Sequence, residues 1–174
     1  FFVLWGLWGW RLIRGDIDIC ERIAEESVQL AESVPEARDL QPEAYWTVGC
    51  TAYYKGELTK GRVLLQKGLD LNNPERERVY ALGTGQYCSV LCRTHIALAL
   101  WQLGFPDQAI QLADESVRLA KPLNHPFSLA MATFFRRQIL QFLGRDQQAA
   151  ASVEDEYRNC HDQGFAFYEV HAMF

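Results

Sequence analysis

The stretch LGFPDQAIQLADESVRLA, residues 103–120, decides the fold of this chain. A glycine at position 104 is followed by Phe-Pro-Asp and then by small and apolar residues at helical spacing. Positions three and four apart lie on one face of an α-helix. The stretch therefore predicts an amphipathic helix that begins after a glycine turn, with one buried stripe. That stripe consists of Ala109, Leu112, Ala113, Ser116, Val117 and Ala120.

The same pattern occurs four times, after Gly15, Gly56, Gly104 and Gly144. A small residue five positions after each glycine allows two helices to approach closely, and mostly apolar residues follow nine and thirteen positions after it. Repeated helical hairpins of this kind stack into solenoids. We therefore predict an all-α fold, a right-handed solenoid of tetratricopeptide-like hairpins. The small residues are Cys20, Gly61, Ala109 and Ala149.

The expected elements follow from the turns and the helix breakers. Each glycine is expected to end a helix in a left-handed conformation, and the Pro- and Asn-rich segment LNNPERERVYALGTGQ, residues 71–86, is expected to be the longest loop. We expect one domain over 1–174, with four hairpins and a partial fifth. The hairpins are expected at 1–34, 41–72, 86–121 and 126–162, with a partial helix at 165–174. Helices are expected near 2–14, 17–33, 42–55, 58–71, 86–103, 106–121, 126–143 and 146–162.

Composition narrows the classes of function. A net charge of -5 without a basic stripe argues against a nucleic-acid partner. The apolar start FFVLWGLWGW is ten residues long, whereas a membrane span needs ~20. Both apolar ends, which start and stop inside patterned helices, favour a fragment of a larger protein. The five cysteines are expected to be reduced thiols in a cytoplasm.

One part of the chain resembles a known family. The segments LWQLGFPDQA (100–109) and LNHPFSLA (123–130) resemble the tetratricopeptide-like region of bacterial adenylate/guanylate cyclase-type multidomain ATPase signalling proteins. The similarity is strongest over residues 86–167. It implies a helical repeat attached to an ATPase and a nucleotide cyclase, whose motifs lie upstream in such proteins. The chain has no GxxxxGK[ST] phosphate-binding loop, so we expect no catalysis and no cofactor here.

Aromatic residues at matching offsets before the glycines are candidates for a binding groove. They lie on the first helix of each hairpin, which lines the concave face of tetratricopeptide-like solenoids, and an aromatic groove suits an extended peptide or a helix. The alternative is that the rings are buried between hairpins. The candidate residues are Trp46, Tyr53, Tyr54, Trp101, Gln102, Phe134 and Gln138.

Three further groups have a structural and a functional interpretation. Cys88, Cys92 and His95 share one helical face and are either metal ligands or buried core residues. Arg136 and Arg137 either pair with acids such as Glu156 inside the hairpin or meet an acidic partner. His125, in NHPFS at a predicted helix start, either hydrogen-bonds the backbone at the turn or acts as a general base.

The function expected from these observations is a non-catalytic protein-interaction or regulatory module of a bacterial cytoplasmic signalling protein. Its partners would be a protein or peptide, upstream domains of the same chain, or a second copy bound through the apolar ends. The alternative is a sensor that binds a small ligand in the aromatic groove. A closed cage of rings would favour the sensor, and an open surface would favour a protein partner.

Overall fold

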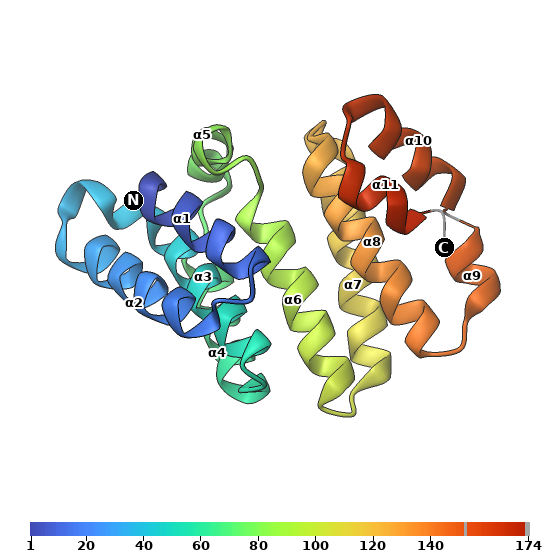
Figure 1. The fold of residues 1–174 in the computed structure, drawn as a ribbon, viewed down its shortest axis with the longest axis horizontal. Helices are drawn as coiled ribbons and strands as arrows, with labels where there is room; N and C mark the ends of the chain where they lie inside the picture. Colours follow the sequence, from blue (N-terminus) through green and yellow to red (C-terminus); the bar gives the residue numbers. More distant parts are fainter. Residues whose placement is uncertain (152, 173–174) are drawn as a thin grey trace.

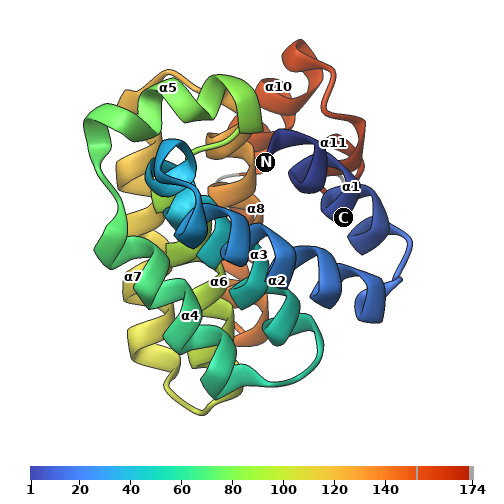
Figure 2. The same ribbon diagram turned by 90° about the vertical axis from the view of Figure 1, so that its left-hand side faces the viewer.

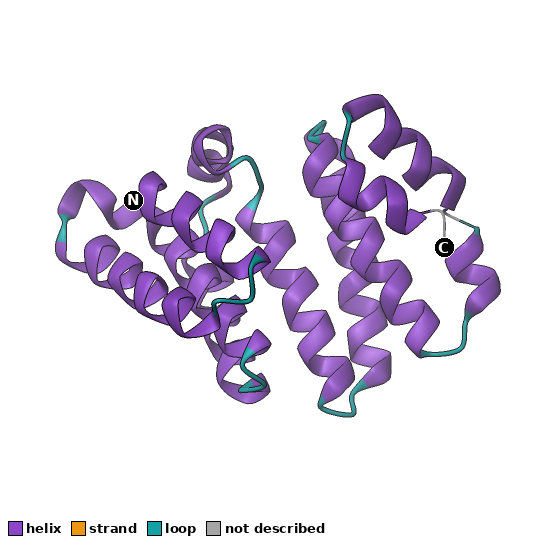
Figure 3. Ribbon diagram, viewed as in Figure 1, coloured by secondary structure: helices purple, strands orange, loops and turns teal. Residues whose placement is uncertain are grey.

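The computed structural model describes residues 1–151 and 153–172, and these residues form helices and turns without a strand (Figure 3). The predicted all-α fold class is therefore confirmed. Seven of the eight predicted full helices lie within two residues of an observed one. The α-helices are α1 (Phe2–Ile13), α2 (Ile17–Ser33), α3 (Gln41–Tyr54), α4 (Leu58–Leu71), α5 (Pro74–Thr84), α6 (Cys88–Gln102), α7 (Pro106–Ala120), α8 (Pro126–Phe142), α9 (Asp146–Ala150), α10 (Val153–Gln163) and α11 (Ala166–Ala172), and the short 3-10 helices are η1 (Pro35–Leu40) and η2 (Lys121–Leu123).

The glycine turns have the predicted backbone. Gly15, Gly56, Gly104 and Gly144 have φ values of 77°, 82°, 87° and 65°. In this left-handed region a Cβ would be strained, so glycine ends the first helix of each pair at little cost. Gly164, at 70°, makes the same turn before α11.

The helices on either side of each glycine turn pack against each other as antiparallel pairs (Figure 1). The helix that precedes each glycine also contacts the corresponding helix of the next pair, in the series α1, α3, α6, α8. Helix α11 continues the series by packing on α8. Figure 2 shows the consequence: α1 and α11 lie on one side of the molecule, and α4 and α7 on the opposite side.

Close helix approach occurs where the small residues were predicted. A Cβ built on Gly61 of α4 would lie 3.0 Å from the carbonyl oxygen of Gly49 and 3.0 Å from the amide nitrogen of Tyr53, both in α3. Cys20, Ala109 and Ala149, at the same offset in the other pairs, are buried. The small residue is thus required because a larger side chain would collide with the backbone of the partner helix.

The prediction of a long loop over 71–86 is wrong, because most of that segment is helix α5. The Asn73 side chain accepts hydrogen bonds from the backbone amides of Glu75 and Arg76, and Pro74 occupies the first turn. Gly85, with φ 71°, ends the helix. Asn-Pro therefore acts as a helix start here, since a capping side chain replaces the hydrogen bonds that the first amides lack.

The C-terminal pair differs in detail from the prediction. The helix expected over 146–162 is divided into α9 and α10, and residue 152 between them lies outside the described residues. The partial helix expected over 165–174 is observed as α11, and residues 173 and 174 likewise lie outside the described part.

Candidate interaction surface

One predicted groove residue, Trp46, belongs to the core. It is 4% exposed and packs against two other indoles, those of Trp5 and Trp8, with ring centroids 4.9 Å away in each case. Trp8 donates from Nε1 to Thr51 Oγ1 over 2.9 Å. The placement of Trp46 on a binding surface is therefore wrong, because longer first helices bring the Trp rings of α1 and α3 together and enclose them.

The end of α3 presents two tyrosines, as predicted. Tyr54 is 46% exposed, and Tyr53 is half-buried with its ring centroid 5.1 Å from that of Tyr54. Gln102, at the end of α6, donates from Nε2 to the Tyr53 hydroxyl over 2.6 Å. The predicted pairing of aromatic rings with amide side chains is thus present where α3 and α6 meet.

The predicted residues of α6 and α8 lie on the same series of helices. Trp101 is half-buried and stacks on Phe142, with centroids 4.3 Å apart. Phe134 is half-buried and contacts Phe167 of α11 at 6.1 Å. Gln138 is half-buried on α8.

Two of the most exposed rings lie outside the list of predicted groove residues, although the offsets before Gly144 select one of them. Phe142 is 48% exposed and Phe167 is 62% exposed. Phe142 lies two residues before Gly144, the offset that Tyr54 has before Gly56, so the pattern contained its signal. Phe167 belongs to the partial fifth repeat and has no later glycine from which to count. We define the aromatic face as Tyr53, Tyr54, Trp101, Phe134, Phe142 and Phe167.

His95 is buried under the aromatic face, and its ring lies near rings of both α3 and α8. Its ring centroid lies 6.1 Å from Tyr53, 6.2 Å from Tyr54 and 5.5 Å from Phe135, whose ring adjoins Phe134 at 4.8 Å. Burial lowers the pKa of His95 to about 4, and its Nδ1 donates to the Leu91 carbonyl over 2.9 Å. Burial also raises the pKa of the half-buried Tyr53. These groups are therefore neutral at neutral pH, which suits apolar and hydrogen-bonding contacts.

The Cys88, Cys92 and His95 group is packed as core. The two sulfurs lie 3.6 Å apart, and all five cysteines are free and buried. His95 instead directs its Nδ1 at the backbone of its own helix. Within residues 1–151 and 153–172, no three His, Cys, Asp or Glu side chains are arranged to hold a metal ion.

Both arginines of α8 form ion pairs, but only Arg137 forms the predicted one inside its own hairpin, since the partner of Arg136 lies on α7. Arg137 Nε lies 3.0 Å from Glu156 Oε2, and both side chains are 5% exposed. Arg136 Nε lies 2.5 Å from Asp114 Oδ1. Neither guanidinium is thus presented to an acidic partner.

His125 has the predicted structural role at the start of α8. Its Nδ1 accepts from the backbone amide of Ser128 over 3.2 Å. Ser128 Oγ in turn accepts from the backbone amide of Tyr87 over 3.0 Å, at the start of α6. The LNHPFSLA segment therefore caps one helix and positions the beginning of another.

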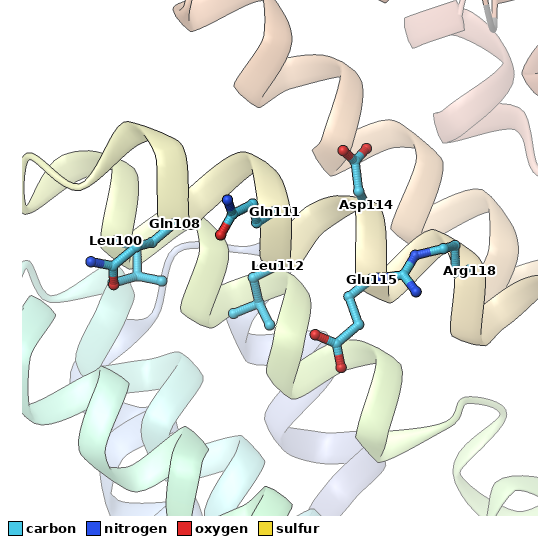
Figure 4. Close-up of a pocket in the computed structure, with 7 residues that line it drawn as sticks. All are labelled: Leu100, Gln108, Gln111, Leu112, Asp114, Glu115 and Arg118. Carbon is cyan, nitrogen blue, oxygen red and sulfur yellow. The ribbon is translucent and has the colours of Figure 1, made fainter.

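Four cavities among the described residues lie away from the aromatic face. The largest of four, about 640 Å³, runs along the outer side of α7 (Figure 4). Its polar side chains are spread along the helix and do not converge on one point, and Glu115 already pairs with Arg93 at 3.1 Å. None of these four cavities is lined by a residue of the aromatic face.

Comparison of the chain with protein-family models, with curated proteins and with solved structures gave no match. Among the described residues, no helix combines the length and apolarity needed to cross a bilayer.

Proposed function

We propose that this chain is a protein-interaction module that binds an apolar peptide or an amphipathic helix on its aromatic face. The observation that carries the proposal is the exposure of Tyr54, Phe142 and Phe167, which is 46%, 48% and 62%. These rings come from α3, α8 and α11, three members of the series of contacting helices α1, α3, α6, α8 and α11. Exposed rings supported by packed rings are the anchors that protein interfaces use most.

The openness of the surface supports a macromolecular partner over a small ligand. A sensor pocket encloses most of its ligand's surface, whereas the rings of the aromatic face reach solvent. Half-buried Tyr53, Trp101 and Phe134 would fix the exposed rings in place, so little side-chain entropy would be lost on binding. Gln102 and Gln138 would supply hydrogen bonds that orient the partner.

We further infer that the stacked pairs form a tetratricopeptide-like solenoid. The left-handed glycine turns, the small residues at the crossings and the contacts between alternate helices support this assignment. The role as a regulatory module of a bacterial signalling protein, attached to an ATPase and a nucleotide cyclase, comes from the resemblance of residues 86–167.

Selection of peptides from a random display library tests the interaction directly. We expect the purified chain to select peptides with two or more apolar anchors and micromolar affinity. Tyr54→Ala and Phe142→Ala should each weaken binding by about 1–2 kcal/mol or more, measured by titration calorimetry. The matched control is Val63→Ala, since Val63 is an exposed apolar residue on α4, away from the aromatic face. Selected peptides that bind all three variants as well as the wild type would refute the proposal.

A further inference from the structure

A second site lies where the first turns of α3 and α5 meet the end of α4. A cavity of about 240 Å³ opens there, far along the fold from the aromatic face. Six of its lining residues carry the inference, namely Arg38, Asp39, Glu43, Arg76, Glu77 and Tyr80. Two of them, Glu43 and Glu77, are buried carboxyl groups.

Glu77 is a structural carboxylate with its partners in place. Oε1 accepts from the backbone amide of Ser89 over 2.5 Å, and Oε2 accepts from Asn72 Nδ2 over 3.2 Å. Its position in the first turn of α5 also suits the helix dipole. Glu77 thereby ties α5 to the start of α6, and the fold accounts for its burial.

Glu43 is buried with less compensation, since a hydrogen bond from its own backbone amide favours the carboxylate but does not offset burial. Its residue is 2% exposed, and its Oε2 atom is buried with no hydrogen-bond partner. The first turn of α3 favours a carboxylate there, but the dipole supplies no donor to Oε2. An unsatisfied buried oxygen is costly, so a donor from outside the chain would relieve it.

The cations at the cavity mouth do not supply this donor. Arg76 Nε is directed at Asp39, with Oδ2 3.5 Å away, and the Tyr80 hydroxyl lies 3.5 Å from the same oxygen. Arg38 is exposed on η1. The floor of the cavity is therefore acidic and short of hydrogen-bond donors, while its mouth carries guanidinium groups.

We propose that this cavity binds the primary ammonium group of a small organic molecule, which donates hydrogen bonds to Glu43 beside Glu77. An ammonium group offers three donors and a positive charge in a compact volume, and the cavity admits only a small molecule. A carboxylate on the same molecule would meet Arg38 at the mouth. The described residues contain no three-ligand metal cluster, which favours a molecular cation over a metal ion.

Titration calorimetry with three small probes tests the site. Methylammonium and glycine should bind, whereas acetate should give no heat. If glycine binds more tightly than methylammonium, the Arg38 guanidinium at the cavity mouth also binds the carboxylate. Equal affinities would limit recognition to the ammonium group. Wild-type protein that binds neither amine refutes the proposal and leaves an ordered water as the partner of Glu43.

Two variants are expected to change the affinity for methylammonium in opposite directions. Glu43→Gln keeps the size of the side chain and should weaken methylammonium binding about tenfold or more. Arg76→Gln removes a cation from the mouth and should strengthen it a few-fold. Glu75→Gln, in the exposed part of the same α5 turn and outside the cavity lining, is the matched control and should change nothing. Unchanged affinity in both test variants would overturn the assignment.

Proton release gives an independent measurement. Burial, and after it the charge of Glu77, raises the pKa of Glu43 to about 7, so the group is partly protonated at neutral pH. A bound cation favours the carboxylate and should expel that proton, making the binding heat depend on the ionisation enthalpy of the buffer. Asp39, Glu77, Arg38, Arg76 and Tyr80 are unchanged in Glu43→Gln, so loss of the buffer dependence there assigns the proton to Glu43. Tyr54→Ala should bind methylammonium normally, which separates this site from the peptide surface.

Discussion

The indole of Trp46 and the imidazole of His95 meet edge to face, with ring centroids 5.6 Å apart and planes inclined at 82°. Both residues are buried, Trp46 within the Trp cluster of α1 and α3 and His95 on α6. Above them on α3 lie the tyrosines of the aromatic face. The contact thus joins the core of the first repeats to the proposed binding surface.

His95 should make the fold sensitive to acid. Its pKa falls from about 6.5 in the unfolded chain to about 4 in the fold, so the fold favours the neutral ring. Its stabilising contribution is complete above pH 6.5 and is lost as the pH falls towards 4, by about 3 kcal/mol. Glu43 acts in the opposite direction, since its raised pKa favours the fold at lower pH. Urea unfolding of wild type and His95→Phe from pH 7 to pH 4 isolates the His95 part, and parallel profiles would contradict it.

Trp46→Ala and Tyr54→Ala should separate core from surface. Removing the buried Trp46 ring leaves a cavity beside Trp5 and Trp8 and should cost about 3–5 kcal/mol of folding stability. Removing the half-exposed Tyr54 ring should cost about 1 kcal/mol or less. Thermal melts of the two variants provide the measurement. Equal losses would mean that Tyr54 is also a core residue and would weaken its role in binding.

Gly61→Ala should destabilise the chain although it improves helix propensity. The added Cβ would lie 3.0 Å from backbone atoms of α3, which cannot move independently of the helix. We expect a loss of about 1–3 kcal/mol. Gly6→Ala is the control, because nothing lies within 4 Å of its Cβ position in α1, and it should gain about 0.5–1 kcal/mol. A stable Gly61→Ala would contradict the close crossing of α3 and α4.

The Arg137–Glu156 pair should show strong coupling. Arg137→Met would leave the Glu156 carboxylate in a buried site and release the hydrogen bond from Arg137 to the His171 carbonyl, 2.6 Å long. We expect a loss of about 3–5 kcal/mol. The double variant Arg137→Met with Glu156→Leu should recover most of it, since the buried carboxylate is removed together with the guanidinium. A double variant as unstable as the two single losses added together would show that the residues act separately.

The exposed apolar residues of α1 should promote self-association. Val3 and Ile13 are 84% and 89% exposed, and Trp10 is exposed beside them on the same helix. Apolar residues gathered in this way favour contact with a second copy or another domain. Light scattering over a range of concentrations should show a mass that rises above the monomer and falls back in Ile13→Glu. A monomer at every concentration would argue against this contact.

Local chemistry accounts for how much of the fold was predictable. Glycine turns, small crossing residues and helical periodicity are encoded within a few positions of one another, so seven of the eight full helices of the hairpins could be located from the chain alone. Helix α5 was missed because Asn72-Asn73-Pro74 can either end a helix or begin one. Its actual role depends on the Asn73 side chain and on Glu77, whose partner Ser89 lies in another helix.

The sequence by itself determined an all-helical chain and its glycine turns, because each depends on residue type at a short or repeated spacing. It offered the ion pair of Arg137 and the capping role of His125 as one of two interpretations, and the structure decided for them. Only the tertiary structure decided which rings are surface and which are core. Trp46 and Tyr54 both lie on α3, yet Trp46 is enclosed because two indoles of α1 cover it, whereas Tyr54 extends beyond that contact. The unpartnered oxygen of Glu43 likewise became visible only when α3, α4 and α5 were placed together. Burial is a property of the neighbours that a side chain acquires on folding, and a one-dimensional pattern does not contain them.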